Sequence, residues 1–230
     1  MVESTRNLSG RLNIGAIAGG ILATIFFLSI MVYQPTQVNS VLRDGFEAFP
    51  NDWSIEIQNG TVETSKEIVH NGTYSLRIYS PSTESYASVS IDIPAGLSQA
   101  FHFQIWFYVD SSIPTDHMYL ADFRDSQSFI QSRVVATDSN GKCYVAVLKS
   151  QGSGYEDSSY WNVCSISKDS WHKLELIWNA SEYTIKVDDQ DYGVFQPRSP
   201  NISVEKLYLG DTTVGGFSGL IYFDDLTMKP

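Results

Sequence analysis

The chain has 230 residues, of which 43% are hydrophobic, 13% aromatic and 18% charged. Such a composition can bury enough apolar surface to offset chain entropy, which excludes a disordered chain. Its 26 acidic residues outnumber the 15 basic ones and give a formal net charge of −11, so binding to a nucleic acid backbone is excluded as well. Two cysteines cannot build a disulfide-rich scaffold or a four-cysteine zinc site.

The first predicted element is a transmembrane helix over residues 13–33. Residues 14–33 read IGAIAGGILATIFFLSIMVY without a charged side chain, and about twenty apolar residues cross the hydrocarbon core of a bilayer. Arg6 and Arg11 precede this segment and acidic residues follow it. The positive-inside rule then predicts a cytoplasmic N-terminus over residues 1–12, a single pass through the cell membrane and an extracellular C-terminal domain. A cleavable signal peptide is the alternative, and the Gly15-xxx-Gly19 spacing leaves self-association open.

A short linker is predicted over residues 34–43, and the rest of the chain, residues 44–230, shows the period-2 alternation of half-buried strands. In residues 101–109, for example, Phe101, Phe103, Ile105, Phe107 and Val109 alternate with more polar neighbours. Turn clusters containing Asn-Gly, Ser-Pro or Asn separate about a dozen such segments, and no helical crossover lies between them. The sequence therefore predicts an all-β, two-sheet antiparallel sandwich.

Cys143 and Cys164 lie in two flanking strands of this prediction, with a polar insert of 20 residues between them. In an exported domain they are expected to form a disulfide at the base of the insert. A pair of reduced cysteines in the core is the alternative.

Four Asn-x-Ser/Thr motifs fall at predicted turns of the same domain, which is the pattern of a glycosylated cell-surface protein. Their asparagines are Asn59, Asn71, Asn179 and Asn201.

Several motifs of residues 44–230 resemble the concanavalin A-like lectin/glucanase superfamily, in its LamG-like and carbohydrate-binding-module branches. They are DGFE at 44–47, HNGTYSLR at 70–77, FQIWFYVD at 103–110, WHKLEL at 171–176, TIKVDDQDYG at 184–193 and IYFDDL at 221–226. Their order and spacing cover nearly the whole predicted domain. The resemblance implies a jelly-roll fold.

The same resemblance implies a structural calcium ion where the first and last strands meet. The implied ligands are Glu47, Asp224 or Asp225, Glu67, the carbonyl of Gly45 and a carbonyl near His70. Acidic residues that flank buried strands need a cation or hydrogen-bond donors, and calcium prefers carboxylate and carbonyl oxygens.

No catalytic motif stands out, so the sequence predicts a protein that is not an enzyme. Glycosidases of this fold need two carboxylates on one face, and Asp189 with Asp191 has that spacing only within a polar turn. The four histidines are scattered, without metal-binding or general-base spacing.

Aromatic side chains mark two predicted ligand sites, because aromatic rings stack on sugar rings. One is the insert between the cysteines, with Tyr155, Tyr160, Trp161 and Asn162, and the other is a strand face with Trp106. The predicted function is a membrane-anchored, non-catalytic module that binds a glycan or a cell-surface protein. A structural or adhesive subunit of the cell envelope and a divergent glycan hydrolase or lyase are the alternatives.

Overall fold

The structure is a computed structural model that describes residues 41–50, 52–148, 160–212 and 218–230. The structure does not support the prediction of a single-pass membrane protein. Within the described ranges no helix is long and apolar enough to cross a membrane. The segment predicted to do so, residues 13–33, lies outside those ranges, as does the predicted cytoplasmic segment.

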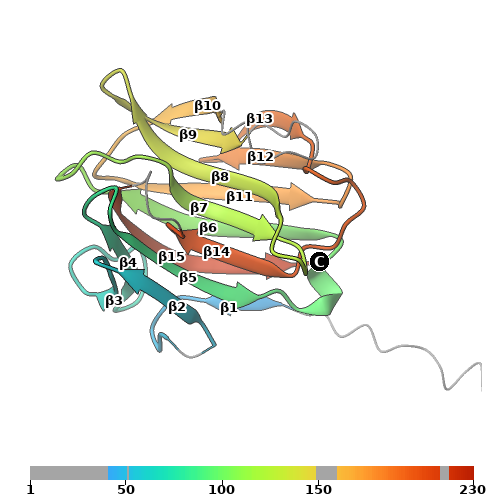
Figure 1. The fold of residues 1–230 in the computed structure, drawn as a ribbon, viewed down its shortest axis with the longest axis horizontal. Coiled ribbons are helices and arrows are strands. Elements are labelled where there is room, and N and C mark those ends of the chain that lie inside the picture. Colours follow the sequence, from blue (N-terminus) through green and yellow to red (C-terminus); the bar gives the residue numbers. More distant parts are fainter. Residues whose placement is uncertain (1–40, 51, 149–159, 213–217) are drawn as a thin grey trace, which may run out of the picture. The chain divides into compact units, whose positions relative to one another are not determined.

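The described residues form two antiparallel sheets, which we call sheet A and sheet B (Figure 1). Sheet A runs in the order β13 (Gln190–Phe195), β12 (Tyr183–Val187), β11 (Trp171–Trp178), β6 (Phe101–Val109), β15 (Gly219–Lys229), β4 (Ser75–Ser80) and β3 (Thr61–Ser65), and β1 (Leu42–Asp44) also pairs with β15. Sheet B runs in the order β10 (Tyr160–Ile166), β9 (Lys142–Leu148), β8 (Ile130–Ser139), β7 (Met118–Arg124), β14 (Lys206–Gly210), β5 (Tyr86–Asp92) and β2 (Ser54–Gln58). A single turn of 3₁₀-helix, Ala95–Leu97, precedes β6. The predicted all-β sandwich is confirmed.

The core lies between the two sheets and is rich in aromatic rings. Phe101 and Trp178 stack at 5.7 Å between ring centroids, and Trp178 stacks on Tyr183 at 5.3 Å. The face predicted for residues 101–109 is confirmed, because all five alternating residues of β6 are at most 3% exposed. These side chains fix which face of each strand points outward, and so which residues are available for function.

The first strand is held by its neighbours at the end of the chain. β1 pairs with residues 226–228 of β15, and Asp44 accepts a hydrogen bond of 2.6 Å from the indole N–H of Trp53. Phe46, directly after β1, is fully buried. The start of the described chain is therefore part of the core.

Sequence reasoning missed β3, β13 and most of β10, which are polar strands near sheet edges. β13 begins within the acidic run that reads as a turn, and the carboxylate of Asp191 accepts a bond from the N–H of Gly193. Tyr160, Trp161 and Asn162, expected in a loop, begin β10. Edge strands are solvated on more than one side, so their sequences lack the apolar alternation of central strands.

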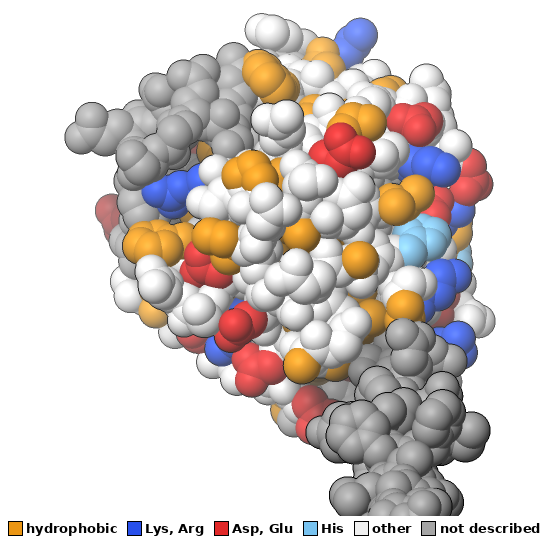
Figure 2. All heavy atoms as spheres, turned by 90° about the vertical axis from the view of Figure 1, so that its right-hand side faces the viewer, with side chains coloured by type: hydrophobic (Ala, Val, Ile, Leu, Met, Phe, Trp, Pro, Cys, Tyr) orange, Lys and Arg blue, Asp and Glu red, His pale blue; other side chains and the backbone are white. Residues whose placement is uncertain are grey.

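Seen from the right-hand side of Figure 1, the surface mixes acidic, basic and apolar side chains around an area of uncharged polar groups (Figure 2).

Candidate functional site

The outer face of sheet B carries a row of polar side chains that point away from the core. Ser90 of β5 is paired with Tyr208 of β14, Tyr208 with Asp122 of β7, and Asp122 with Arg133 of β8. Register therefore places one residue from each of four neighbouring strands side by side. We call Asp122, Arg124, Arg133, Tyr119, Tyr208 and Tyr160 the Asp122 cluster.

A bulge in β7 creates this face. The register of the pairing between β7 and β8 shifts between Tyr119 and Ala121. Tyr119 and Asp122 therefore lie on the same outer face although they are three residues apart. Regular alternation would put them on opposite faces, and the extra residue of the bulge brings them to the same face. The bulge therefore adds a carboxylate to an aromatic row.

Two arginines hold the Asp122 carboxylate. Its Oδ2 accepts bonds of 2.8 Å from Nη2 of Arg124 and 2.8 Å from Nη2 of Arg133, and the Nε of Arg124 lies at 3.1 Å. Each guanidinium also lies over a tyrosine ring, Arg124 at 4.1 Å from the centroid of Tyr208 and Arg133 at 4.0 Å from that of Tyr119. Stacked and charge-assisted contacts of this kind fix the orientation of arginine side chains.

The cluster has a buried floor and a partly exposed rim. Asp122 and Tyr119 are fully buried and Arg133 is 8% exposed, whereas Arg124 and Tyr160 keep part of their surface. Burial alone lowers the pKa of the Arg133 guanidinium, but the negative charge of Asp122 and the nearby tyrosine hydroxyls reverse this, so the pKa is raised. Burial raises the pKa of Tyr160, while Arg133 partly offsets that shift. Both residues keep their usual charge at neutral pH.

Three buried polar atoms on this face have no hydrogen-bond partner among the residues that the structure describes. They are Oδ1 of Asp122, Nε of Arg133 and Oγ of Ser88. Ser88 is paired with Gly210, and Gly210 with Tyr119, so the hydroxyl belongs to the row next to the carboxylate. Buried polar atoms nearly always have partners, and several exceptions on one face indicate a missing ligand or water. An acceptor beside a donor is the arrangement that a sugar hydroxyl satisfies.

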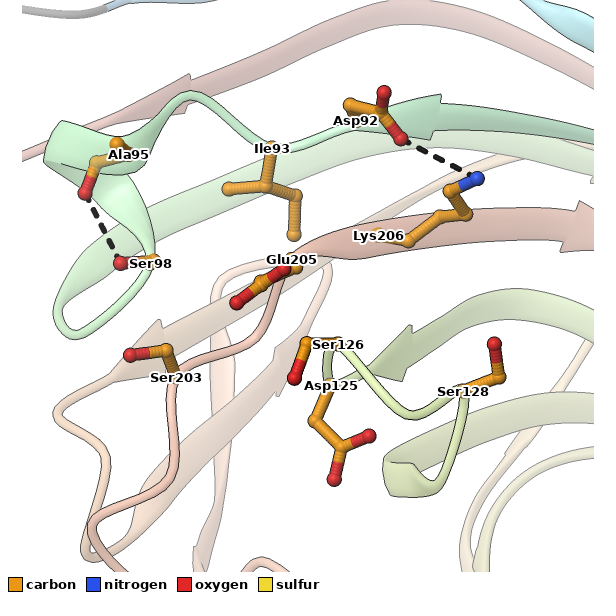
Figure 3. Close-up of a pocket in the computed structure, with 10 residues that line it drawn as sticks. All are labelled: Asp92, Ile93, Ala95, Ser98, Asp125, Ser126, Ser128, Ser203, Glu205 and Lys206. Atoms are coloured by element: carbon orange, nitrogen blue, oxygen red, sulfur yellow. Dashed lines mark hydrogen bonds and ion pairs between the residues drawn. The ribbon is translucent and has the colours of Figure 1, made fainter.

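A polar hollow of about 560 Å³ opens at the end of the same strands (Figure 3). Lys206 lines it, is paired in register with Arg124 and forms an ion pair of 3.3 Å with Asp92. Asp125 also lines it, but both its oxygens accept bonds from the following loop and from Gln131. The hollow therefore extends the polar surface beyond Arg124, and the exposed Glu205 brings a further carboxylate to its lining.

The structure disperses the predicted ligand residues. Tyr160 joins the Asp122 cluster, where its hydroxyl bonds to Arg133 and its ring lies 4.4 Å from that of His117. Trp161, 51% exposed, lines a separate hollow of about 310 Å³, and Asn162 is exposed. Trp106 lies on the outer face of sheet A, stacked on His70 at 3.9 Å. Tyr155 lies outside the described residues.

The residues implied as calcium ligands meet, but their carboxylates face N–H groups. Glu47 accepts bonds from the backbone N–H groups of Thr73 and Tyr74 at 2.7 and 3.1 Å, and Asp224 accepts two of 3.0 Å from those of His70 and Asn71. The side chains of Asp225 and His70 pair at 2.8 Å, and Glu67 is exposed. Gly45 lies close to the same group, because a Cβ atom added to it would be 4.0 Å from Oδ1 of Asp225.

These donors bear directly on the calcium expectation. Burial raises the pKa of Asp224, and the N–H groups of Asn71 and Asp225 partly offset that shift. In the described part of the chain, no group of three or more His, Cys, Asp or Glu residues is arranged to hold a metal ion. N–H groups bond to Oε1 of Glu47 and to both oxygens of Asp224, so a cation would have to share or displace these donors, and the calcium ion stays a prediction.

The two cysteines are free thiols in the structure, so the expected disulfide is not formed. Cys143 is paired in register with Ile166 and Cys164 with Val145, which places the cysteines diagonally on β9 and β10. Diagonal neighbours are about 7–8 Å apart, beyond the usual Cα separation of a disulfide. The reduced pair, the alternative in the sequence, is what the structure holds.

The four candidate glycosylation asparagines, Asn59, Asn71, Asn179 and Asn201, are all exposed. Exposure is necessary for modification but does not demonstrate it, and the motifs stay a prediction.

No family model and no curated protein matches the sequence. Solved structures do. A carbohydrate esterase, vb_24B_21, from a Shiga toxin-encoding bacteriophage is 17% identical, with 77% of this chain and 89% of that one covered and a TM-score of 0.55. A sialidase is 16% identical over 84% of this chain, with a TM-score of 0.60, but only 19% of its own length is covered.

The cellulose-induced protein Cip1 is 13% identical, with 81% and 96% of the two chains covered and a TM-score of 0.57. These likenesses show the fold, a β-sandwich jelly roll that occurs in carbohydrate-active proteins. The finer LamG-like assignment stays a prediction.

Sequence reasoning missed Asp122, Arg124 and Arg133, the centre of the site. Asp122 and Arg124 are two residues apart, the spacing of neighbours on one strand face, and Arg133 directly precedes the apolar residues Val134, Val135 and Ala136 of β8. Charged residues within a central strand were the available signal. Only the fold shows that the two strands are adjacent.

Proposed function

We propose that the chain is a carbohydrate-binding module whose site is the Asp122 cluster on the outer face of sheet B. One observation carries the proposal. A buried acceptor, Oδ1 of Asp122, and a buried donor, Nε of Arg133, lie in one ion cluster without partners among the described residues. Sugar hydroxyls both donate and accept, so a diol, directly or through a bridging water, pairs with both atoms. The jelly-roll neighbours, an esterase and a sialidase among them, support a carbohydrate ligand in general.

The charges of the site favour a neutral sugar. Two arginines face the carboxylate of Asp122, Asp211 is buried next to Thr212, and Thr212 accepts a bond from Arg124. The local charges therefore come close to balance, while the whole chain carries −11. An anionic polysaccharide would be repelled at long range and would find no uncompensated cation at the site.

The same contacts favour binding without catalysis at this site. The Asp122 carboxylate is held in a fixed orientation by two guanidinium groups. A glycosidase needs a second carboxylate that faces the same bond, and the partners of Asp122 in the cluster are arginines instead.

Affinity electrophoresis of the whole chain tests the proposal. We expect retardation in gels containing neutral polysaccharides such as xylan, arabinan or soluble cellulose derivatives, and none with alginate or polygalacturonate. Failure of every neutral polysaccharide to retard the chain would contradict glycan binding, and retardation by the anionic ones alone would contradict the neutral class.

Two matched arginine variants locate the site. Arg124→Gln is expected to weaken binding about 10-fold or more, because hydrogen bonds to a charged group contribute about 1.5–3 kcal/mol. Arg77→Gln is the control, since Arg77 also pairs with a carboxylate, that of Glu63, and lies over a tyrosine ring, that of Tyr79, but on sheet A. Equal effects of both substitutions would contradict a site on sheet B.

A further inference from the structure

A second constellation lies at the turn between β10 and β11, away from the Asp122 cluster. His172, the second residue of β11, is 8% exposed, and its Nδ1 lies 2.7 Å from Oδ2 of Asp188, which follows β12. Its Nε2 lies 3.2 Å from Oγ of Ser167 and 3.1 Å from Oγ of Ser170. A carboxylate, an imidazole and a hydroxyl are thus linked in series.

The carboxylate fixes the ring. Oδ1 of Asp188 accepts a bond of 2.9 Å from the backbone N–H of Lys173, which holds the carboxylate in place while Oδ2 faces the imidazole. A proton on Nδ1 then points at Asp188, so Nε2 of the neutral ring presents its lone pair to the serine hydroxyls. This is the orientation that a general base needs.

The surroundings also stabilise the ring once it takes a proton. The carbonyl oxygen of Ser167 lies 2.9 Å from Nε2 and can accept only from a protonated nitrogen. Asp188 balances the positive charge on the other side of the ring. Proton transfer from a serine to His172 therefore gains one hydrogen bond and one ion pair.

Ser167 opens onto a cavity. The side chain is exposed and lines a hollow of about 650 Å³ between the end of β10 and the turn after β8. Lys168 lines the same hollow, its ammonium group 2.6 Å from Asp138 and 3.2 Å from the carbonyl of Ile113. A substrate carbonyl in this hollow would lie beside both a hydroxyl and a fixed cation.

We propose that Ser167 is a nucleophile for small carboxylic esters, with His172 as its general base and Asp188 as the residue that positions the ring. Ser167 Oγ bonds to the ester carbonyl carbon while its proton moves to Nε2 of His172. The carbon–alkoxide bond then breaks, and the alcohol leaves with that proton. Water attacks the acyl-serine, gives a proton to Nε2 and releases the acid, and the serine regains its proton.

The group that stabilises the oxyanion in this scheme is the ammonium of Lys168. Preorganised charge near a developing oxyanion is the largest contribution in many acyl-transfer enzymes. Because Asp138 partly balances Lys168, we expect slow turnover and good reaction with activated esters and phosphonates.

Labelling with a fluorophosphonate tests the nucleophile. The whole chain is incubated with the probe beside a known serine hydrolase, and intact mass and peptide mapping locate the adduct. We expect one adduct, on Ser167, and slow hydrolysis of p-nitrophenyl acetate. The proposal is overturned if the chain takes up no probe while the reference enzyme does, or if the adduct lies elsewhere.

Variants separate chemistry from folding. Ser167→Ala changes an exposed side chain and is expected to abolish labelling with an unchanged melting temperature. His172→Asn is expected to slow labelling about 100-fold or more, the usual contribution of a general base. His117→Asn is the matched control, because His117 also pairs with an aspartate, Asp116, and is expected to leave the rate unchanged. Equal labelling of the His172 and His117 variants would overturn the proposal.

Two substitutions of Asp188 test the positioning residue. Asp188→Asn removes the carboxylate that faces Nδ1 of His172 and is expected to slow labelling about 100-fold or more. Asp188→Glu keeps a carboxylate and is expected to restore part of the rate. Equal labelling rates for the two variants, at equal melting temperatures, would overturn the role of Asp188.

Discussion

At the scale of single residues, the balance of charge around Asp122 connects stability and function. The side chain is fully buried and both of its ion-pair partners are at most 15% exposed. Buried ion pairs add little to stability as a whole, but removing one partner leaves the other charges uncompensated. The cluster is therefore stable only as a unit, and this fixes in place the atoms that have no partner among the described residues.

We expect Asp122→Asn to lower the free energy of unfolding by about 3–5 kcal/mol, because the buried guanidinium group of Arg133 and the partly exposed one of Arg124 lose their counter-charge. Urea denaturation of both chains measures the difference. Glu63→Gln is the control and should change the free energy far less, since solvent screens the exposed pair of Glu63 with Arg77. A similar, small effect for both substitutions would show that the arginines have other partners.

At the scale of elements, the sequence predicted the central strands well because apolar alternation follows directly from burial. β6 and β11 alternate over their lengths and lie in the middle of sheet A. β13 contains acidic residues and glycine and lies at the edge of that sheet, where the pattern that marks a strand is weakest.

The candidate site was less predictable than the strands. Tyr160 was predicted as a ligand residue from its ring alone, whereas its partner Arg133 lies on β8, two strands away in sheet B. The strand order that brings β14, β7 and β8 together depends on contacts far apart in the chain. Periodicity reports which face a residue takes, but not which strand lies beside it.

The pairing of β9 with β10 also sets the reactivity of the cysteines. Burial raises the pKa of Cys143 to about 12 and that of Cys164 to about 11, and only the thiolate reacts. We expect neither thiol of the native chain to react with Ellman's reagent at pH 8 within an hour, and both to react in concentrated urea without reductant. Rapid native reaction would show that β10 separates from β9, and no reaction in urea would show a disulfide.

The raised pKa values of Cys143 and Cys164 also predict how the stability of the chain changes at alkaline pH. A thiol whose pKa is higher in the folded chain than in the unfolded chain keeps its proton on folding, so its contribution is complete below about pH 8.5. Stability should then fall as the pH rises from about 9 through the folded values of about 11 and 12. Replacing both cysteines by alanine should reduce that part of the slope in urea titrations.

At the scale of the whole molecule, the first and last described strands, β1 and β15, are hydrogen-bonded to each other in sheet A. Every strand of the described residues lies between Leu42 and Lys229, and the contacts of residues 39–230 form one compact unit. β1 pairs with β15, and Phe46 fills the core beside Trp53, their ring centroids 5.8 Å apart. A few residues at the start of this unit thus hold the two ends of the sandwich together.

Two truncations test this closure. A chain that begins at Asn39 keeps β1 and Phe46 and is expected to unfold in urea in a single transition, with the same free energy as the full chain. A chain that begins at Asp52 loses both, and with them the Asp44 partner of Trp53. Because deleting a buried Phe side chain alone costs about 3–5 kcal/mol, the shorter chain should be destabilised by at least that amount or fail to fold. Equal stability of the two truncations would mean that the C-terminal half of β15 needs only β6 as a partner and that its pairing with β1 adds no stability.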